Sequence, residues 1–371
     1  MYWLEIGSIH FPLLISEKEF GPVNRAQRPS PFMKKAAAYA SNRSIEVVES
    51  LSVPPGPGEV RLDVAYCGIC GTDMHIFLGH MDQRVSQPLV IGHEVSATVA
   101  EVGEGVTEFS TGDRVAVRPL CFGPETAFDR GNAHVGRNLK FIGIDQPGGM
   151  QASWTVPAYT LHNLPQELSM QHGAMIEPAA VACHDVRLGE VKAGETCVVI
   201  GGGPIGLLIA LVAKSKGARV ILSEINEVRL ELTESLGIIT VNPLKEKLPE
   251  AVAKITDGAM ADCVFEVSGS APGVEAMTEV AAARGRIVMV AIHPEPRPVS
   301  LFKFFWSELR LIGARLYEPC DFDEAIALAA SGQLSLDKLI TEVRPLDEVQ
   351  AAFEEIERQP SGIKTLISCA S

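Results

Sequence analysis

The 371-residue sequence predicts an α/β protein of two domains, a small β-barrel-like domain and a doubly wound parallel sheet. Three observations predict this fold class. From residue 33 to about 181, short apolar runs are broken by Gly and Pro, which is typical of a strand-rich domain. From Cys197 to about Tyr317, strand-like runs alternate with helical stretches. The length suits two domains, each large enough to bury a core.

The first 32 residues stand apart from this plan. They combine mixed charge and several prolines with no apolar segment behind a basic start, so they make a poor signal peptide. The first strand of the strand-rich domain is expected to begin at Met33. We therefore expect residues 1–32 to be an extension without a catalytic role. It is either a short segment packed on the surface or the result of a start codon assigned too early.

The strands of the first domain can be placed individually. Residues 60–66 alternate between apolar and polar side chains, the pattern of a half-buried strand, and the Pro/Gly-rich residues 54–58 before them form a loop. A second strand is expected at 95–102, and the Gly112-Asp113 turn leads into a third at 114–117.

The second domain opens with a strand at 197–200, a helix at 207–215 and another strand at 219–222. A later strand is expected at 286–292. The chain is expected to be helical again from Phe322, and residues 346–353 form its clearest amphipathic stretch.

The segment 201–206, Gly-Gly-Gly-Pro-Ile-Gly, lies between a strand and a helix and predicts a dinucleotide-binding turn. Its first glycine permits the tight turn, its third lets a pyrophosphate approach the backbone, and its last lets helix and strand pack closely. The pyrophosphate would lie at the helix N-terminus, where free N–H groups favour anions. An ordinary glycine turn is the alternative. The predicted contacts are Gly201, Gly203, Pro204, Ile205 and Gly206.

Glu224 follows the next strand, 23 positions after Gly201, close to the spacing expected of a carboxylate that binds the adenosine ribose hydroxyls. It would repel a 2′-phosphate, and Ile225 and Asn226 supply no compensating cation. NAD is therefore predicted in preference to NADP. Arg229 either lies near the adenine or ribose or is a solvated helix residue.

A second group of residues has the composition of a catalytic zinc site. Cys70, His93 and Glu94 offer sulfur, nitrogen and oxygen ligands and would leave one position open for water or substrate. Glu177 would be a nearby partner or an exchangeable fourth ligand, or else a carboxylate at a helix N-terminus. Cys67 and Cys70 could instead form a redox pair, but their flanking residues do not match one.

His93 and Glu94 are adjacent, so on a regular strand their side chains would point to opposite faces. Binding of one ion by both residues requires an irregular backbone, which Gly92 permits. The residues alone do not decide whether His93 and Glu94 bind the same ion.

The segments 68–75 (GICGTDMH), 92–94 (GHE) and 177–178 (EP) resemble the motifs of the zinc-dependent medium-chain dehydrogenase/reductase family, the alcohol, sorbitol and threonine dehydrogenases. The resemblance covers nearly the whole chain from Met33. It implies a GroES-like β-barrel catalytic domain, residues 33–181 and 322–371, and a Rossmann dinucleotide-binding domain, residues 182–321. It also implies that Cys70, not Cys67, binds the metal.

The resemblance further implies zinc-dependent hydride transfer between NAD and a secondary alcohol. Thr72 would accept the substrate proton and His75 would relay it, although polyol-oxidising relatives can release protons through water. Asp73 would orient His93. The pattern is closest to the sorbitol, threonine and butanediol branch, so a polyol, sugar acid, diol or hydroxy amino acid is expected. The corresponding pocket residues are Phe77, Phe122, Arg315 and Tyr317.

Two details of these expectations concern single residues. Arg315 could bind a polyhydroxyl or carboxylate group, or it could be a surface strand residue. Many relatives hold a structural zinc with four closely spaced cysteines, but residues 121–136 contain only Cys121, and Gly136 stands near the place of the last one. A four-cysteine site is therefore impossible, and one zinc per subunit is expected.

Composition excludes several other classes. A net charge of −14 argues against nucleic acid or an anionic membrane as a partner, and no apolar run is long enough for a membrane span. The eight cysteines are dispersed, which favours a reducing cytoplasm. Two rivals remain: a non-catalytic NAD-binding protein and a metal-free quinone-reductase-like enzyme. The Cys70, His93, Glu94 and Thr72 set argues against both.

Residues 301–306, LFKFFW, place four aromatic side chains within five positions beside an expected sheet edge. A soluble monomer rarely exposes so much apolar surface. We expect a homodimer or a homotetramer built of such dimers, because relatives commonly pair their Rossmann edges. The alternative is that these rings fill the cleft between the domains.

Overall fold

The computed structural model describes residues 3–6, 9–12, 33–41, 43–293, 295–359 and 362–370. The chain divides into two compact units, residues 1–32 and residues 33–371. In the first unit, β1 (Trp3–Ile6) pairs antiparallel with β2 (Ile9–Pro12). The remainder of that segment lies outside the described residues, so its expected lack of a catalytic role stays a prediction.

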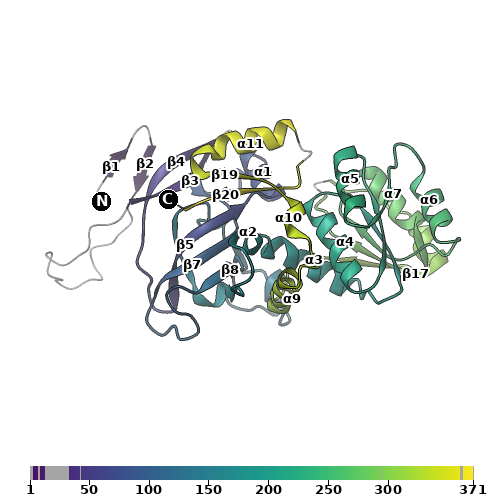
Figure 1. Ribbon diagram of the computed structural model, residues 1–371, viewed down its shortest axis with the longest axis horizontal. Helices are drawn as coiled ribbons and strands as arrows, with labels where there is room; N and C mark the ends of the chain where they lie inside the picture. Colours follow the sequence, from purple (N-terminus) through teal and green to yellow (C-terminus); the bar gives the residue numbers. More distant parts are fainter. Residues whose placement is uncertain are drawn as a thin grey trace. The chain divides into compact units, whose positions relative to one another are not determined.

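The second unit opens with the predicted strand-rich part (Figure 1). Its main sheet runs in the order β12 (Leu161–Asn163), β8 (Arg114–Val117), β7 (Glu94–Val102), β5 (Glu59–Gly68), β20 (Lys364–Ser368) and β19 (Ile340–Pro345). Strand β11 (Ser153–Pro157) lies outside this order and pairs with β5. A smaller sheet has the order β4 (Ser44–Leu51), β3 (Met33–Ser41), β6 (Leu89–Val90), and β9 (Leu120–Cys121) pairs with β10 (Lys140–Phe141). The strands predicted at 60–66, 95–102 and 114–117 are confirmed, as is the start at Met33.

The C-terminal tail returns to this sheet, as the resemblance implies. In Figure 1 the yellow β19 and β20 lie among the violet and blue strands, and β20 is antiparallel to β5. This pairing carries Lys364 into the interior of a domain that begins about 300 residues earlier in the chain. The amphipathic stretch at 346–353 forms a short turn, Leu346–Glu348, and the start of helix α11 (Val349–Arg358).

The second part is the predicted doubly wound sheet. Its parallel strands run in the order β15 (Ile239–Val241), β14 (Arg219–Ser223), β13 (Thr196–Ile200), β16 (Ala261–Glu266), β17 (Ala281–Met289), β18 (Arg310–Gly313). The direction of winding reverses at β13, where such sheets bind their ligands. The strand expected at 286–292 already ends at Met289. The helices of this part are α4 (Pro204–Ser215), α5 (Glu227–Ser235), α6 (Leu248–Ile255), α7 (Ala271–Glu279) and α8 (Leu301–Ser307).

One helix, α3 (Ile176–Leu188), joins the two sheets. It runs across the predicted boundary at residues 181/182 and contacts both α4 and α9 (Pro319–Ala330). One hydrophobic cluster accordingly contains buried residues of both parts, such as Val95 and Val199. Because the core is continuous there, the two parts meet as packed layers within one compact unit.

The contact between α3 and α9 is polar as well as apolar. The buried carboxylate of Asp321 accepts hydrogen bonds from His184 Nδ1 and Arg187 Nε, each at 2.8 Å. His184, Glu318 and Asp321 resemble a metal-binding group. However, Arg187 forms ion pairs with both carboxylates, so we interpret this group as an ion-pair network that holds the two helices together.

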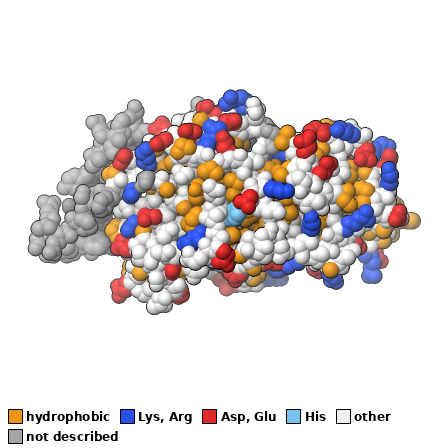
Figure 2. Space-filling model, viewed as in Figure 1, with side chains coloured by type: hydrophobic (Ala, Val, Ile, Leu, Met, Phe, Trp, Pro, Cys, Tyr) orange, Lys and Arg blue, Asp and Glu red, His pale blue; other side chains and the backbone are white. Residues whose placement is uncertain are grey.

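The remaining helices are α1 (Gly71–Phe77), α2 (Met170–Gly173) and α10 (Leu336–Leu339). In the described part of the chain, no helix has the length and apolar character needed to cross a bilayer. Acidic and basic side chains are interspersed on the face shown in Figure 2, with apolar side chains between them.

Candidate active site

The start of helix α1 directs Cys70 towards His93. Cys70 is the N-cap residue of α1, and its Sγ accepts a hydrogen bond of 3.2 Å from the Thr72 N–H. In return, the Asp73 carboxylate accepts one of 3.0 Å from the Cys70 N–H. These two bonds fix the orientation of the sulfur, which lies 3.1 Å from Nε2 of His93.

His93 reaches the sulfur because the backbone before it is irregular, as predicted. Gly92 has a φ of +92°, a conformation that disfavours other residues, and a Cβ there would lie 2.6 Å from Cys67 Sγ. Strand β7 begins only at Glu94, so His93 is free of the strict alternation of a strand. Cys67 itself is fully buried on β5, and burial raises the pKa of its thiol.

Asp73 lies behind His93, where the sequence placed it. The carboxylate Oδ1 is 3.6 Å from Nδ1 of the imidazole, slightly too far for a hydrogen bond. Both atoms are buried, and neither has a hydrogen-bond partner among the described residues. Although burial opposes it, the charges of Cys70 and Asp73 raise the pKa of His93.

These residues fit a zinc ion. The donor atoms of Cys70, Asp73 and His93 lie within 4.8 Å of one another. A thiol sulfur and an imidazole nitrogen are typical zinc ligands, and a carboxylate beside the other ring nitrogen is the usual support of a metal-bound histidine. The two buried atoms that lack a hydrogen-bond partner in the described part of the chain, Asp73 Oδ1 and His93 Nδ1, are not the donor atoms that face each other in the Cys70–His93 pair.

Glu94 does not join Cys70 and His93 in this arrangement, contrary to the expected three-ligand set. Both of its carboxylate oxygens accept hydrogen bonds of 2.7 Å from Nζ of Lys364, which also donates to the Ile69 carbonyl. Each of the two charged side chains is only 2% exposed. A buried ammonium requires an anion, and Glu94 supplies it here, while the role of Glu94 as a zinc ligand stays a prediction.

Glu177 is in the first turn of α3 and is buried beside the zinc-type residues. Its Oε1 accepts a 2.7 Å hydrogen bond from the hydroxyl of Tyr317, which is fully buried. Burial raises the pKa of Glu177 to about 7, while the nearby His93 opposes the shift. Two predicted site residues, 140 positions apart, are thus in direct contact.

The other predicted residues of α1 have different environments. Thr72 is half-buried beside the sulfur, whereas His75 is exposed and its Nδ1 lies 3.2 Å from Nδ1 of His80. Phe77, expected in the substrate pocket, is 1% exposed and packs against Phe353 in a tilted arrangement with ring centroids 5.3 Å apart. This environment gives Phe77 a packing role in the core.

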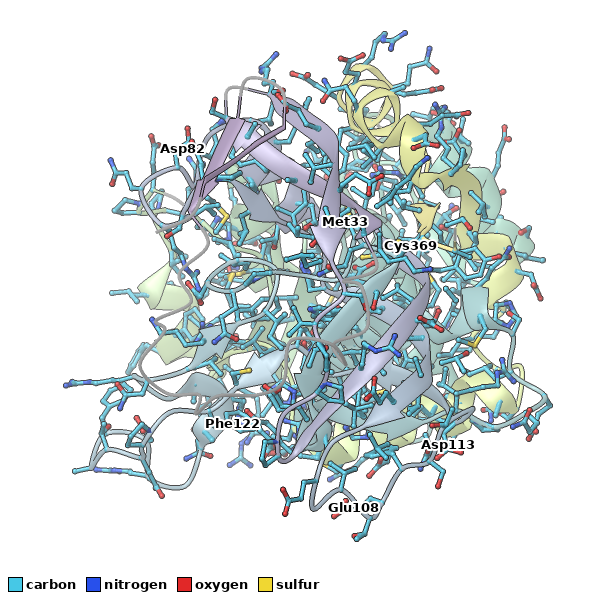
Figure 3. All side chains as sticks on the ribbon, turned by 90° about the vertical axis from the view of Figure 1, so that its left-hand side faces the viewer. Met33, Asp82, Glu108, Asp113, Phe122 and Cys369 are labelled. Atoms are coloured by element: carbon cyan, nitrogen blue, oxygen red, sulfur yellow. The ribbon has the colours of Figure 1, made fainter. Side chains whose placement is uncertain are left out.

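The remaining two pocket candidates, Arg315 and Phe122, are nearer the surface. Arg315 is exposed, and burial of part of its side chain together with the neighbouring Arg84 lowers its pKa. Phe122, labelled in Figure 3, stacks on Tyr159 with ring centroids 6.2 Å apart. The guanidinium of Arg118 lies 5.4 Å from the centre of the Phe122 ring.

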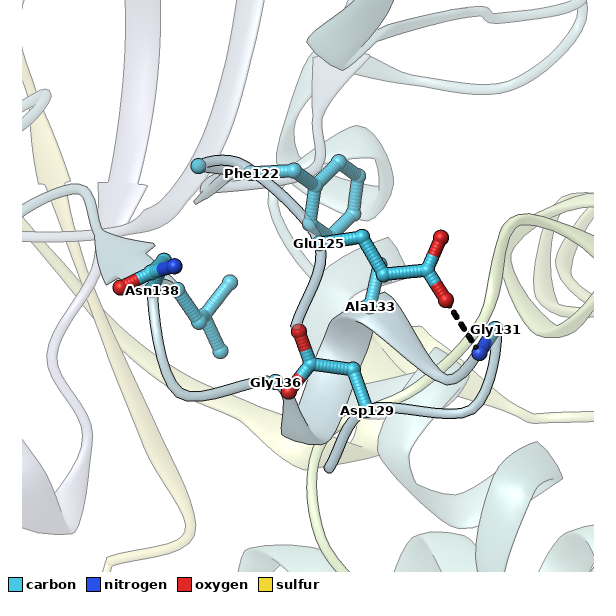
Figure 4. A pocket seen from close by; sticks show the side chains of 9 residues that line it. Phe122, Glu125, Asp129, Gly131, Ala133, Gly136 and Asn138 are labelled. Carbon is cyan, nitrogen blue, oxygen red and sulfur yellow. Dashed lines mark hydrogen bonds between the residues drawn. The ribbon is translucent and has the colours of Figure 1, made fainter. Parts of the chain in front are cut away.

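The lobe after Cys121 is organised around a carboxylate. Asp129 accepts hydrogen bonds from the backbone N–H groups of Thr126 and Arg137, at 2.8 and 3.0 Å, and from the Thr126 hydroxyl. The backbone hydrogen bonds lower the pKa of Asp129. Figure 4 shows this residue beside a cavity of about 60 Å³, with the bond from the Gly131 N–H to Glu125. No pattern in the sequence indicates this role of Asp129.

The glycine turn has the predicted geometry. Gly201 has a φ of +108°, and a Cβ at Gly206 would lie 1.9 Å from the Gly201 carbonyl oxygen, so helix α4 could not pack there with a larger residue. Gly203 is the N-cap residue of α4, followed by Pro204. A Cβ at Gly203 would meet nothing closer than 3.9 Å, which leaves that side of the turn open.

Glu224 closes the turn from the neighbouring strand. One carboxylate oxygen accepts the Gly202 N–H at 2.8 Å, and the other accepts the N–H groups of Ile225 and Asn226. Nη1 of Arg229 lies 3.8 Å from the first oxygen, and its Nη2 donates to the Gly362 carbonyl. The sequence analysis did not assign Gly202 to the site, although its place as the middle glycine of residues 201–203 could have indicated it.

Comparisons with known proteins identify the family of the chain. The model of the alcohol dehydrogenase GroES-like domain matches residues 56–166, and that of the zinc-binding dehydrogenase domain matches residues 204–331. A 2-dehydro-3-deoxy-L-galactonate 5-dehydrogenase of Pseudoalteromonas atlantica is 53% identical over 90% of this chain and 98% of its own. A sorbitol dehydrogenase of Halalkalibacterium halodurans is 31% identical over 87% of this chain and 95% of its own.

Solved structures give the same result. A zinc-binding dehydrogenase of Sinorhizobium meliloti bound to NADP matches with a TM-score of 0.85 and 32% identity, over 91% of this chain and 99% of that one. An alcohol dehydrogenase of Escherichia coli in complex with NADH matches over the same shares with a TM-score of 0.84 and 28% identity. The chain therefore belongs to the zinc-dependent medium-chain dehydrogenase family. It is an oxidoreductase with a GroES-like domain and a Rossmann domain.

Proposed function

We propose that this enzyme oxidises a secondary alcohol of a sugar acid with NAD, using one zinc ion per subunit held by Cys70 and His93. The observation that supports the proposal is the part-buried Cys70–His93 pair, together with the buried Glu177–Tyr317 pair. Polyols, diols and hydroxy amino acids are the neighbouring substrate classes. The sugar acid is favoured because the relative at 53% identity is named for one.

In this proposal zinc, when bound, polarises the substrate hydroxyl and lowers its pKa. Thr72, beside the sulfur, accepts the hydroxyl proton and passes it towards water, and the exposed His75 is the residue on the same helix that would complete a relay. Asp73, 3.6 Å from Nδ1 of His93, would orient the ring when the imidazole binds the metal. The alcohol carbon loses a hydride to NAD while its hydroxyl loses the proton, so the products are a ketone, NADH and a proton.

The preference for NAD rests on Glu224. Its carboxylate is 7% exposed and is held in place by backbone N–H groups at the end of β14. A fixed negative charge there would repel the 2′-phosphate of NADP. Arg229 is the cation that could weaken this effect, at 3.8 Å from the carboxylate.

The proposed function predicts zinc- and NAD-dependent activity on sugar acids. Purified protein should contain about one zinc per chain and form NADH, followed at 340 nm, with a 3-deoxy-2-ketoaldonate or aldonate, more efficiently than with polyols, threonine or simple diols. Activity should be lost on chelation and return with zinc. NAD binding without turnover of any of these substrates would instead favour the non-catalytic protein, and zinc-independent quinone reduction with NADPH would favour the other rival.

We further propose that the chain forms a homodimer, alone or within a tetramer, through α8 and the edge strand β18. Four side chains of α8 are 64–78% exposed: Leu301, Phe302, Phe305 and Trp306. Strand β18 is at the end of the sheet order, and its Leu311 is 48% exposed. An interface around a two-fold axis would cover both the rings and the open edge. A reducing cytoplasm is the proposed location, because Cys70 must stay reduced to bind a metal as a thiolate.

This assembly predicts that Phe305→Asp combined with Trp306→Asp shifts the protein towards the monomer, because the two charges would have to be buried in the interface. The control is Phe304→Asp, since Phe304 packs partly against the core and its loss should lower thermal stability instead. Light scattering of the parent at micromolar concentration should give at least twice 39.8 kDa. A parent that remains at the monomer mass contradicts the proposal.

A further inference from the structure

Arg118 is a buried cation that lacks a carboxylate partner. It directly follows β8 and is 5% exposed. Its Nη2 donates to the Tyr159 carbonyl at 2.8 Å and its Nε to His162 at 3.3 Å, while Nη1 has no hydrogen-bond partner among the described residues. Within the described chain no carboxylate lies within 4.0 Å of this guanidinium. Burying a charge in this way is costly unless something pairs with it.

The fold places Arg118 beside the zinc-type residues. Strands β7 and β8 are antiparallel with Val95 opposite Val117, so Arg118 and Glu94, the neighbour of His93, each adjoin this pair. Burial lowers the pKa of Arg118, and Tyr317 is the first of the groups that oppose this shift. Tyr317 in turn donates to Glu177. The guanidinium therefore contacts the lobe residue Phe122 and interacts electrostatically with Tyr317, the hydrogen-bond partner of Glu177.

The surrounding side chains do not neutralise Arg118. His162 accepts the Arg118 N–H at Nε2, which requires a neutral imidazole whose Nδ1–H donates to Asp323 at 3.1 Å. Asp323 is 73% exposed on the far side of that ring. Arg114, on the same strand, provides a contrast, because its guanidinium is occupied by the carbonyls of Pro165, Gln166 and Leu168. Arg114 is a structural arginine, whereas Arg118 retains a free donor.

We infer that Arg118 binds the carboxylate of the substrate and sets the preference for sugar acids over neutral polyols. The inference rests on the proposed function. A planar guanidinium binds a carboxylate with directional, charge-assisted hydrogen bonds, and Nη1 is the donor available for it. Arg118 takes this role from Arg315, the arginine that the sequence suggested, because Arg315 is exposed.

The test compares an acid with a neutral substrate of the same carbon number, a 3-deoxy-2-ketoaldonate or aldonate and the corresponding alditol. Steady-state kinetics with NAD are measured for the parent, Arg118→Gln, Arg118→Lys and the control Arg315→Gln. We expect Arg118→Gln to lower kcat/KM for the acid by about 100-fold, mainly through KM, and for the alditol by less than about threefold. Arg118→Lys should recover part of the loss, and Arg315→Gln should leave the acid-to-alditol ratio unchanged.

A purely structural role of Arg118 would lower both values together, so an unchanged acid-to-alditol ratio in Arg118→Gln overturns the inference. The inference is also overturned if the parent prefers a polyol phosphate to the acid and Arg118→Gln loses this preference. The anion bound by Arg118 would then be a phosphate. If the parent turns over neither substrate, the proposed function fails. Calorimetric binding of an aldonate to the NADH-bound parent and to Arg118→Gln then decides the role of Arg118, and equal affinities contradict it.

Discussion

Replacing Cys70 with Ala should abolish turnover, with a loss of at least about 1,000-fold, while NAD binding stays nearly unchanged. The Cys70 sulfur is one of the two close donor atoms of the candidate zinc site, 3.1 Å from His93 Nε2, and alanine offers no ligand in its place. The dinucleotide turn lies elsewhere, between β13 and α4. The measurements are zinc content by atomic emission, NADH binding by fluorescence and NAD reduction with the best substrate.

Cys70→Ser is the matched control for this variant. The sulfur also caps helix α1 by accepting the Thr72 N–H, and loss of a cap costs about 1 kcal/mol. Serine keeps a capping acceptor but is a much poorer zinc ligand than a thiolate. If both variants lose zinc and activity while Cys70→Ser retains the parent's melting temperature, the metal explains the loss. Dehydrogenase activity in a variant shown to be zinc-free would refute the mechanism.

The double variant Glu224→Ser and Ile225→Arg should raise the ratio of kcat/KM for NADP to that for NAD by about 100-fold or more. It removes the carboxylate that repels the 2′-phosphate and adds a cation that binds it. The site can accept the arginine, because Ile225 is 58% exposed. Initial rates with both cofactors at a saturating concentration of alcohol measure the ratio.

Ile225→Arg alone separates the two contributions, since it adds the cation and leaves the carboxylate. We expect it to shift the ratio far less than the double variant does. Arg229→Gln tests whether the arginine 3.8 Å from Glu224 already assists a phosphate. A double variant that discriminates against NADP as strongly as the parent would show that Glu224 does not contact the ribose.

Local patterns were sufficient for the fold class and for the cofactor turn. The strand periodicity at 60–66 and 95–102 and the glycines at 201–206 act over a few residues, and each was found where the sequence predicted it. Gly92 belongs to the same group, because its positive φ serves the two residues that follow it. Features of this kind depend on backbone sterics and on the alternation of apolar and polar residues. Both can be predicted without knowing which distant segments are in contact.

Contacts between distant segments decided the rest. Whether Glu94 is a ready ligand depends on Lys364, which is 270 positions away, and Glu177 meets Tyr317 across 140 positions. The sequence likewise could not assign Phe77 to the core or Asp129 to the centre of the lobe. The cause is common to all of these pairs. The role of a buried charged or aromatic residue depends on the side chains that pack against it. Only the tertiary fold decides which side chains those are.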